Sequence, residues 1–401
     1  MTEHPWRQRP FGEAVADPDV RDRAARALAS GPLCDHCLGR LLAGAGTGLR
    51  NDERGRIARR ALGQAPAGGR CALCEGLFDQ LDAWAAQVRD AFQPWEFDTF
   101  AVSSRADPAL RQREQALWDR VGGDLAEPYK QAFNREVGVR VAALTGREPD
   151  LDHPDLVAAA DHARGEVTVI ARPLFVAGRY RKLVRGMPQC RWLRWPTSVQ
   201  QIIGDPVCEA AGGADHNFHG AGREDVDVRC LGERPFVLEV LRPHRRRLDL
   251  GALAARINAG RQVEVLGLGP CGPGEPARIK AARPEKTYRA LVRLATPVDA
   301  EALGRLSALA GPIRQRTPRR VLRRRANRVR LGRVRSVAWR RLDPVTFELT
   351  LRTSGGLYIK ELVSGDARRT RPNVAQVLGT AAECAELDVL AIHWPETPDG
   401  A

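Results

Sequence analysis

Two Cys-x-x-Cys pairs restrict the fold of this chain more than any other feature of its sequence. One pair is Cys34 and Cys37, and the other is Cys71 and Cys74. Each short loop can supply two thiolates, so the two pairs together offer the four sulfur ligands of a tetrahedral Zn²⁺ site. A redox-active thiol pair, which needs only one such loop, and buried free thiols are the alternatives. Four cysteine ligands leave no open position for water, so we expect a structural zinc that stabilises its module without taking part in catalysis.

The remaining sequence is typical of a soluble intracellular protein. The first twenty residues, MTEHPWRQRPFGEAVADPDV, lack the apolar core of a signal peptide. No stretch of the sequence approaches the roughly 18 apolar residues that a membrane helix needs. We therefore expect a cytoplasmic location, no membrane partner, and cysteines that are thiols or metal ligands rather than disulfides. The sequence is compatible with a monomer and leaves the oligomeric state open.

The charge of the chain indicates a polyanionic partner. The sequence has 63 Lys and Arg against 49 Asp and Glu, a formal net charge of +14. Arginine supplies nearly all of the positive charge, because lysine occurs only at positions 130, 182, 280, 286 and 360. The guanidinium group binds phosphate with paired donors and stacks on bases, so this composition favours RNA. A generic cationic surface is the alternative.

Helix and strand patterns predict three domains. Residues 1–85 form a small metal-stapled module, with helices starting at Asp17-Pro18 and running over 54–62 and 81–92. Residues 86–195 mix strand patterns, near 97–102 and 165–176, with helices over 109–121 and 127–144. Residues 196–401 contain many short strand-like runs and few helix signals, chiefly 297–310 and 359–363. The whole is therefore predicted to be an α+β protein with a sheet-rich C-terminal domain.

Two stretches of the C-terminal domain have unusual composition. The Gly/Ala-rich stretch AAGGADHNFHGAG, residues 210–222, is predicted to be a flexible lead-in to the segment that follows it. The run PRRVLRRRANRVRLGRVR, residues 318–335, is the most basic part of the chain. Apolar residues recur among its arginines, which favours a strand or helix lying against RNA over a solvated tether.

The segment AGREDVDVRC, residues 221–230, gathers three carboxylates in this basic chain: Glu224, Asp225 and Asp227. The alternation predicts a strand whose valines face the core, while Asp225 and Asp227 share the other face. Three interpretations remain open from these residues alone. The acids form ion pairs with nearby arginines and have no chemical role. They bind Mg²⁺ for phosphoryl transfer or RNA cleavage. One of them is a nucleophile that acts on a flipped base.

Two later stretches favour the third interpretation. In EKTYRALV, residues 285–292, Lys286 and Tyr288 share one face of a predicted strand. In SGGLYIKELVSGD, residues 354–366, a glycine turn leads to Tyr358, Lys360 and Leu362. A tyrosine can stack on an extruded uracil, a lysine can pair with an aspartate, and an aliphatic side chain can close a pocket. Because strand tyrosines are more often core residues, each pattern is weak by itself.

Taken in order, these motifs resemble the active-site series of pseudouridine synthases. GREDVDVR, then KTY, then GLYIKEL follow one another as in that superfamily. The wider match is to family ten of the archaeal and eukaryal tRNA pseudouridine synthases, which acts on uridines 54 and 55 of the T-loop. That family has a CxxCxGR motif, seen here as CDHCLGR, and a block similar to GRYRKLVRGMPQCRW, residues 178–192. A later run of the family is seen here as QRTPRRV, and the similarity extends over roughly residues 30–395.

The resemblance implies a domain order and an activity. It implies a four-cysteine zinc-knuckle module at 1–85, a THUMP-like RNA-binding domain at 86–195 and a pseudouridine synthase catalytic domain at 196–401. The reaction is an isomerisation without a cofactor, so zinc is structural. The uracil is flipped out of the T-arm of tRNA, detached from its ribose and rejoined through C5.

The resemblance also implies roles for single residues. Asp225 is the nucleophile, with attack on the ribose or on the base left open. Tyr288 stacks on the uracil and helps to remove the C5 proton. Tyr358 contacts the substrate, Lys360 pairs with Asp225, and Leu362 packs against the base. Arg223, Lys360 or both are expected to keep Asp225 ionised. Asp227 is expected to pair with an arginine, and Glu224 has no assigned role.

Two other functions remain as alternatives. One is a non-catalytic, zinc-containing RNA-binding protein in which Asp225 is structural. The other is a Mg²⁺-dependent RNA-processing enzyme that uses Glu224, Asp225 and Asp227 as ligands.

Overall fold

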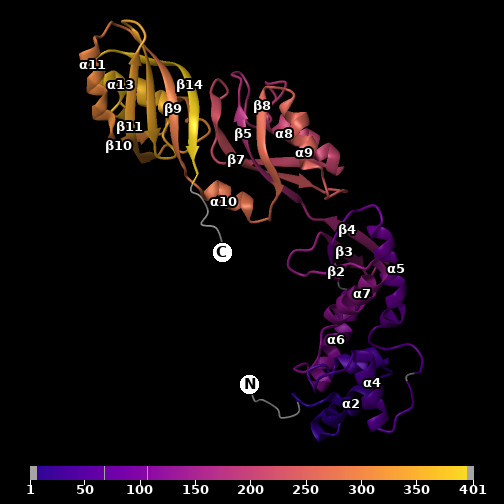
Figure 1. Cartoon of the computed structure of the whole chain (residues 1–401). Helices are drawn as coiled ribbons and strands as arrows, with labels where there is room; N and C mark the ends of the chain where they lie inside the picture. Colours follow the sequence, from indigo (N-terminus) through magenta and orange to yellow (C-terminus); the bar gives the residue numbers. More distant parts are fainter. Residues whose placement is uncertain (1–6, 67, 106, 395–401) are drawn as a thin grey trace. The chain divides into compact units, whose positions relative to one another are not determined.

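The computed structural model describes residues 7–66, 68–105 and 107–394. The chain divides into two compact units, Met1–Arg172 (unit 1) and Pro173–Ala401 (unit 2), whose elements are drawn in Figure 1. The helices of unit 1 are α1 (Phe11–Ala14), α2 (Pro18–Ala29), α3 (Asp35–Arg40), α4 (Asn51–Ala61), η1 (Leu77–Gln80), α5 (Leu81–Phe92), α6 (Pro108–Val121) and α7 (Tyr129–Thr145). Its strands are β1 (Thr99–Arg105), β2 (Glu148–Pro149), β3 (Leu156–Asp161) and β4 (Glu166–Ala171).

Unit 2 has more strand than helix. Its helices are α8 (Val199–Ala211), α9 (Leu250–Asn258), α10 (Glu275–Ala281), α11 (Ala300–Gly304), η2 (Arg305–Leu309), η3 (Arg319–Val321), α12 (Ile359–Ser364) and α13 (Val374–Leu378). Its strands are β5 (Leu174–Lys182), β6 (Asp215–Gly220), β7 (Arg229–Leu241), β8 (Val263–Pro270), β9 (Glu285–Leu294), β10 (Gly311–Arg316), β11 (Val329–Arg341), β12 (Thr346–Thr353), β13 (Thr370–Arg371) and β14 (Ala382–His393).

The helices of unit 1 start where local signals predict them. The Asp17 carboxylate accepts a hydrogen bond from the Asp19 amide, and Pro18 occupies the first position of α2. Asp107 and Pro108 repeat this arrangement at the start of α6. The predicted helix at 81–92 is confirmed as α5, whose buried face includes Trp84. These ends depend on neighbouring residues only, which is why the sequence predicts them.

Two glycines allow the helices around the first cysteine pair to pack very closely. A Cβ atom on Gly39, in α3, would lie 1.7 Å from the carbonyl oxygen of Asn51. A Cβ on Gly55, in α4, would lie 1.9 Å from the carbonyl oxygen of Asp35. Any side chain at either position would therefore force the two helices apart.

The sheet of unit 1 has the order β2-β1-β3-β4. β1 pairs with β2 and β3 in parallel, and β3 pairs with β4 antiparallel. α5 and α7 pack on each other and against this sheet, and both lie beside it in Figure 1. Alternate residues of β3 are buried by this packing, as a sheet covered on one face requires.

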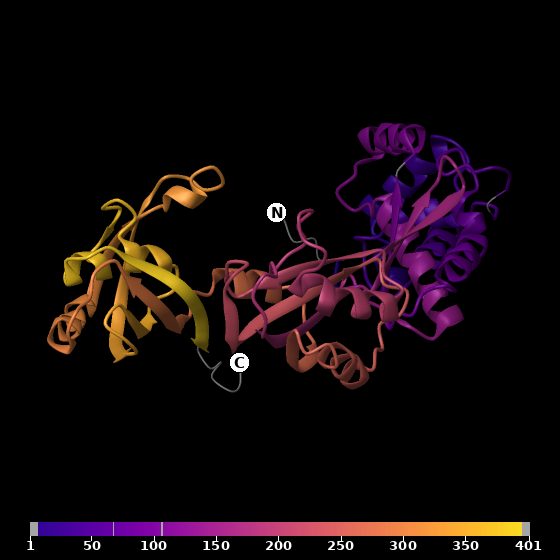
Figure 2. The ribbon, with the colours of Figure 1, turned by 90° about the horizontal axis from the view of Figure 1, so that it is seen from above.

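The sheet of unit 2 runs in the order β13-β10-β11-β12-β9-β14-β7-β5-β8, with β6 paired to β7. Figures 1 and 2 show β5 to β8 and β9 to β14 as two neighbouring groups of strands. Only β7 and β14 join the two groups, through two parallel pairs, Asp388 with Arg229 and Val389 with Cys230.

One buried carboxylate reinforces this junction. Asp388 accepts hydrogen bonds from Arg185 at 2.7 Å, from Arg229 at 2.8 and 2.9 Å, and from Arg289 at 3.0 Å. Burial would raise the pKa of Asp388, but these guanidinium groups outweigh it and hold the pKa below its ordinary value. Asp388 thus stays ionised between the two groups of strands.

Unit 2 differs from the sequence prediction in three places. The stretch 210–222 is not a flexible lead-in, since it contains the end of α8 and the strand β6. Helices α8, α9 and α10 were not predicted, and α8 contains Gly204 and Pro206, which disguise its helical pattern. Strand β5, placed in the central domain by sequence, is hydrogen-bonded between β7 and β8. The division into three domains stays a prediction.

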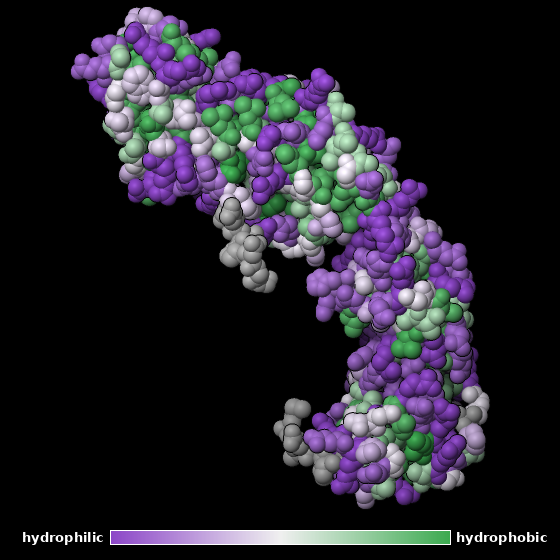
Figure 3. All heavy atoms as spheres, in the orientation of Figure 1, coloured by the Kyte–Doolittle hydropathy of each residue, from purple (hydrophilic) through white to green (hydrophobic). Residues whose placement is uncertain are grey.

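Hydrophilic residues spread over both units on the face shown in Figure 3. Among the described residues, no helix combines the length and apolar character needed to cross a membrane.

Candidate active site

The acidic segment forms a loop, not the strand that its alternation predicts. Residues 221–228 lie between β6 and β7, and we call them the acidic loop. Gly222 has a φ of 83°, a conformation that favours glycine. The Val228 amide donates to the carbonyl oxygen of Asp225 at 3.1 Å. This turn interrupts the two-residue repeat, so the three acids have three different environments.

Glu224 is buried and anchors the acidic loop. Its carboxylate accepts hydrogen bonds from the Tyr180 hydroxyl at 3.0 and 3.2 Å. It also lies 3.1 Å from Nε of Arg234, and both side chains of this ion pair are almost fully buried. Gln189 donates to the Tyr180 oxygen at 2.8 Å and to the Gly222 carbonyl at 3.0 Å. Glu224, for which the sequence indicated no role, is therefore a structural anchor.

A buried lysine fixes the same loop from β5. Nζ of Lys182 donates to the carbonyl oxygens of Met187 at 2.8 Å and of Asp225 and Val226 at 3.2 Å each. The side chain is fully buried, and burial lowers the pKa of Lys182. The backbone of Asp225 is thus held from two sides while its carboxylate remains accessible.

The Asp225 carboxylate is paired with Arg320. Nη1 of Arg320 donates to Oδ1 of Asp225 at 3.1 Å, and Nη2 lies 2.9 Å from Oδ2. The predicted partner, Lys360, has its Nζ 3.9 Å from Asp225 but 2.6 Å from Asp227. Lys360 therefore contacts Asp227 most closely, and the expectation of an arginine partner for Asp227 is wrong.

The cations around these acids keep the site charged. Burial would lower the pKa of Arg320, but its hydrogen bond to Glu361 at 2.6 Å and the charge of Asp225 raise it. Burial would raise the pKa of Asp227, but the Lys360 ammonium outweighs it and lowers the pKa. Arg320 and Asp227 are consequently charged at neutral pH.

Asp225 opens into a cavity of about 140 Å³, called here the inner cavity. Its wall is formed by the acidic loop, β9, the arginine-rich segment (residues 318–335), α12 with the residues before it, and β14. The lining residues are Arg223, Glu224, Asp225, Val228, Arg234, Lys286, Tyr288, Arg320, Val321, Arg325, Leu357, Tyr358, Ile359, Lys360, Leu387 and Val389.

Both predicted tyrosines line the inner cavity. The backbone of Tyr358 is held by the buried Gln315, which donates to its carbonyl at 2.9 Å and accepts from its amide at 2.8 Å. The guanidinium of Arg320 lies 5.9 Å from the centre of the Tyr358 ring. Burial raises the pKa of Tyr288 to about 12, so this phenol is protonated at neutral pH.

Leu362 does not line the cavity. It is fully buried in the hydrophobic core of unit 2, on α12. The apolar wall comes from other residues: Leu357, Ile359, Leu387 and Val389. The role of Leu362 was implied by the family resemblance, and the helix predicted at 359–363 is confirmed as α12. The helical period directs Leu362 into the core instead.

The sequence analysis also missed the roles of Arg320, Arg234 and Gln315. Arg320 and Gln315 both fall in the QRTPRRV run, residues 315–321, that was matched to the family without assigned roles. Their partners are 95 and 43 residues away along the chain. The matched run was the only signal for them, since periodicity does not show contacts over such separations.

The three acids do not form a magnesium site. The nearest cations of Glu224, Asp225 and Asp227 are Arg234, Arg320 and Lys360, so each carboxylate already has a side-chain partner. Within the described part of the chain, the only group of three or more potential metal-ligating side chains is the set of four cysteines.

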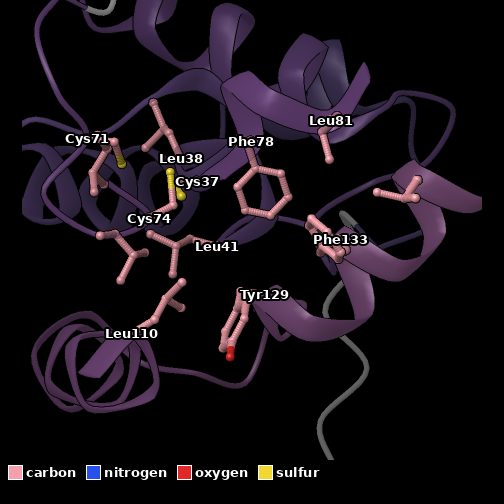
Figure 4. Packing of buried hydrophobic residues seen from close by; sticks show 14 of the residues in the cluster. Cys37, Leu38, Leu41, Cys71, Cys74, Phe78, Leu81, Leu110, Tyr129 and Phe133 are labelled. Atoms are coloured by element: carbon pink, nitrogen blue, oxygen red, sulfur yellow. The ribbon is translucent and has the colours of Figure 1, made fainter. Parts of the chain in front are cut away.

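Those four cysteines lie in unit 1 and fit a metal ion. The sulfur atoms of Cys34, Cys37, Cys71 and Cys74 all lie within 4.8 Å of one another, and those of Cys34 and Cys74 are 3.7 Å apart. A tetrahedron with Zn–S bonds of about 2.3 Å has edges of about 3.8 Å. Figure 4 shows three of these cysteines, Cys37, Cys71 and Cys74, in a hydrophobic core with Leu38 and Phe78. Such a set can hold a structural metal, and it offers no place for a substrate.

Comparison with known proteins shows which family the chain matches. Residues 175–393 match the family model "Pus10, C-terminal", and residues 84–161 match "Pus10 THUMP domain, archaeal". Curated proteins named tRNA pseudouridine synthase Pus10 are similar over nearly their whole length. The Methanothrix thermoacetophila protein is 37% identical over 96% of this chain and 97% of its own. The Pyrococcus furiosus protein is 40% identical over 93% of this chain and 98% of its own.

A third relative, from Methanothermobacter marburgensis, is 41% identical over 94% of this chain and 100% of its own. Among solved structures, a Cbf5-Nop10-Gar1 complex has a TM-score of 0.33 and 17% identity over 53% of this chain and 47% of that chain. The family models and the relatives agree with the predicted resemblance over both units. The chain belongs to the Pus10 family of tRNA pseudouridine synthases.

Proposed function

We propose that this enzyme isomerises uridine 54, uridine 55 or both in the T-loop of tRNA, with Asp225 as the nucleophile. The observation that carries the proposal is the inner cavity, where the accessible carboxylate of Asp225, paired with Arg320, lies among two tyrosines and an apolar wall. The family supports pseudouridylation of tRNA. The positions in the T-loop come from the resemblance of the sequence motifs.

The reaction needs no atoms beyond those of the uridine. The N1–C1′ bond breaks, the base turns, C5 bonds to C1′, and the C5 proton is replaced by a proton on N1. Asp225 forms a transient bond to the ribose or to the base and is released when the new bond forms. Arg320 stabilises the carboxylate as the leaving group and orients it through two hydrogen-bonding nitrogen atoms.

The tyrosines hold the extruded base. Tyr358, fixed by Gln315, contacts the substrate, and Tyr288 stacks on the uracil. Because its pKa is about 12, Tyr288 enters the reaction as a neutral hydrogen-bond donor. The Tyr288 hydroxyl can accept the C5 proton only after it has donated its own proton to another group. Lys360 supports the site through Asp227 and its longer contact with Asp225.

The rest of the chain would bind the tRNA. The THUMP-like domain at 86–195 and the arginine-rich segment at 318–335 would contact phosphates and the shape of the RNA. In unit 1 we propose that the four cysteines bind Zn²⁺, which the sulfur spacing and the all-thiolate ligand set favour. The ion would contribute to folding, and the catalytic residues lie in unit 2.

Tritium release from tRNA transcripts containing 5-³H-uridine tests the proposal, because exchange of the C5 proton accompanies the isomerisation. We expect release that survives EDTA and falls by at least about 10³-fold in Asp225→Asn. Asp227→Asn, in the same loop, is the matched variant and is expected to lose less than about tenfold. Equal losses in the two variants would contradict the assignment of the nucleophile.

Transcripts carrying cytidine at position 54, at 55, or at both identify the target. The T-loop assignment would be refuted if both single-cytidine transcripts released as much tritium as the parent transcript. It would also be refuted if the transcript with both cytidines still released tritium. RNA cleavage that needs Mg²⁺ would instead support the RNA-processing alternative.

A further inference from the structure

A second, larger cavity adjoins the inner cavity. Its volume is about 750 Å³, and we call it the outer cavity. The two cavities share six lining residues: Arg223, Lys286, Tyr288, Arg325, Leu357 and Tyr358. A ligand whose base occupies the inner cavity would therefore extend into the outer one without leaving the protein surface.

The two cavities differ in charge. Asp225 and Glu224 line the inner cavity, whereas the outer cavity has no acidic residue in its wall. Seven cations line the outer cavity: Lys286 and, around it, Arg223, Lys280, Arg283, Arg325, Arg328 and Arg330. None of the seven forms an ion pair with a carboxylate of the described residues, although most cations near the acidic loop do. The outer cavity is thus a site for an anion.

Lys286 is the residue that most needs such an anion. Its side chain lies at the boundary of the two cavities, and the residue is only 9% exposed. No hydrogen bond or ion pair joins its ammonium group to the described part of the chain. A Cβ atom on Gly222 would lie 2.6 Å from its Nζ, so the ammonium is packed directly against the acidic loop. A buried cation without a partner costs folding free energy, which a bound anion would recover.

The charges near Lys286 do not replace that anion. Glu224 is a nearby buried carboxylate, but it is paired with Arg234 and Tyr180. Burial, together with the charge of Arg234, lowers the pKa of Lys286. Burial is the largest cause of this shift, so the ammonium of Lys286 is desolvated without a dedicated anion beside it.

The walls of the outer cavity suit a nucleic-acid backbone. Gly332, Gly355 and Gly356 line it, so the chain offers backbone there without bulky side chains. Arg330 lies 5.8 Å from the ring centre of Tyr358, the tyrosine shared with the inner cavity. Thr317 links the two ends of the loop formed by residues 318–327 of the arginine-rich segment. Its hydroxyl donates to the Ala326 carbonyl at 2.8 Å and accepts from the Arg328 amide at 3.0 Å. The arginines of this segment are held at the mouth of the cavity rather than on a free tether.

We propose that the outer cavity binds the phosphodiester next to the target uridine, with Lys286 as its buried ligand and the surrounding arginines as its outer ligands. The proposal rests on the proposed function, because the inner cavity must receive the uracil for the neighbouring phosphate to reach Lys286. It assigns to Lys286 a role in substrate binding that is separate from the chemistry at Asp225.

A cycle of one protein change and one RNA change tests this assignment. The protein change is Lys286→Met, which removes the charge and retains the buried volume. The RNA change is a neutral methylphosphonate in place of one phosphodiester, placed in turn at each linkage near the target uridine. The measured quantity is kcat/KM for tritium release from full-length tRNA at constant salt.

At one linkage we expect each single change to lower kcat/KM by roughly ten- to hundredfold, and the two together to lower it no further. At the other linkages the two losses should multiply. Lys280→Met, at an exposed position of the same cavity, is the matched variant and should lose less than about threefold. Lys286→Arg should recover most of the loss, because it restores a cation at the same depth.

The proposal would be overturned if the losses of kcat/KM from the protein change and the RNA change multiplied at every linkage. It would also be overturned if Lys286→Met had the kcat/KM of the wild type. A wild-type enzyme that releases no tritium from any tRNA would refute the proposed function instead, so the two failures are distinguishable. A melting temperature of Lys286→Met well below that of the wild type would show that Lys286 supports the fold, and would also overturn the assignment.

Discussion

Lys286 of unit 2 differs from the other buried cations of the described chain, those of unit 1 included, because the protein supplies no partner for it. Near the cysteines of unit 1, buried cations have protein partners: Arg40 pairs with Glu114, and Arg59 donates to Asp35 at 3.0 Å and to the Leu33 carbonyl at 2.7 Å. In unit 2, Lys286 is also buried and has no such partner in the described residues. The four sulfurs of unit 1 converge on a point too small for anything but an ion. The cations of unit 2 surround a space large enough for a nucleotide.

This difference separates polar groups that serve the fold from polar groups that serve a ligand. Satisfied buried groups make a structure more specific, whereas unsatisfied ones cost stability until something binds. Mutation of satisfied buried groups should therefore lower stability, whereas mutation of groups that await a ligand should lower activity, and four predictions test that separation.

The largest effect is expected at the metal cluster. Cys37→Ser removes one thiolate from the proposed zinc site, whose ion would supply folding free energy, so unit 1 should lose several kcal/mol of stability. Metal analysis should fall from about one zinc per chain to well below one, and urea unfolding should show an earlier transition. Cys271→Ser, a half-buried cysteine outside the cluster, is the control and should retain the metal. Full metal content in Cys37→Ser would contradict the four-cysteine site.

The next effect concerns Arg320, on the ligand side of the comparison. Arg320→Met leaves Asp225 without its closest cation and should lower kcat roughly 100-fold, which corresponds to about 3 kcal/mol. Arg320 also donates to the buried Glu361 at 2.6 Å, so its loss should lower the melting temperature as well. Glu361→Gln weakens that pair while Arg320 keeps its charge beside Asp225, so it should lose stability without a comparable loss of kcat. Single-turnover tritium release together with a melting curve measures both quantities. Equal losses of kcat in the two variants would mean that Arg320 belongs with the structural pairs.

A smaller and opposite effect is expected for the stability of Lys286→Met. At pH 7 this variant should be more stable than the wild type by about 1–3 kcal/mol, since a desolvated charge is removed. The pKa of Lys286 is about 8 in the folded chain and 10.5 ordinarily, so the unfolded state binds more protons between these values. Wild-type stability should rise with pH in that window, and the advantage of the variant should shrink. Urea unfolding at pH 7 and pH 10 measures the difference.

The smallest effect is a pH dependence of substrate binding. Lys286 faces Arg234 and Cys230 on β7, Glu224 in the acidic loop and Tyr288 on its own strand, and its pKa of about 8 reflects burial first. Below pH 8 the ammonium is charged and binds phosphate, and above pH 8 it loses its proton. We expect kcat/KM to fall severalfold between pH 7.5 and 9, and Lys286→Arg to shift that fall to higher pH. If the wild type and Lys286→Arg showed the same pH profile of kcat/KM, Lys286 would not be a ligand of the phosphate.

The sequence predicts the parts of this molecule that depend on neighbouring residues. Helix α2 follows from Asp17 and Pro18, and the cysteine cluster follows from its spacing. Tyr288 and Tyr358 were assigned to the site through motifs and do line its cavity. Each of these features is determined within a few residues or by a pattern that few structures share.

The remaining features depend on contacts between distant segments. Which cation pairs with Asp225 is decided by the fold that brings Arg320 to the acidic loop across 95 residues. Strand β6 exists because β7 supplies its hydrogen-bonding partner, although its own sequence is rich in turn-forming residues. Leu362 looked like a pocket residue because the turn to helix at Ile359 was not used to assign its direction. Local pattern cannot decide these points, since the competing arrangements satisfy it equally well.

The junction between β7 and β14 has a mechanical consequence for the catalytic site. Asp225 belongs to the loop that leads into β7, whereas Arg320, Tyr358 and Lys360 belong to the group of strands that ends with β14. Two backbone pairs and the Asp388 carboxylate hold these groups in register. A change at this seam would therefore alter how Asp225 is aligned with Arg320 without touching either side chain.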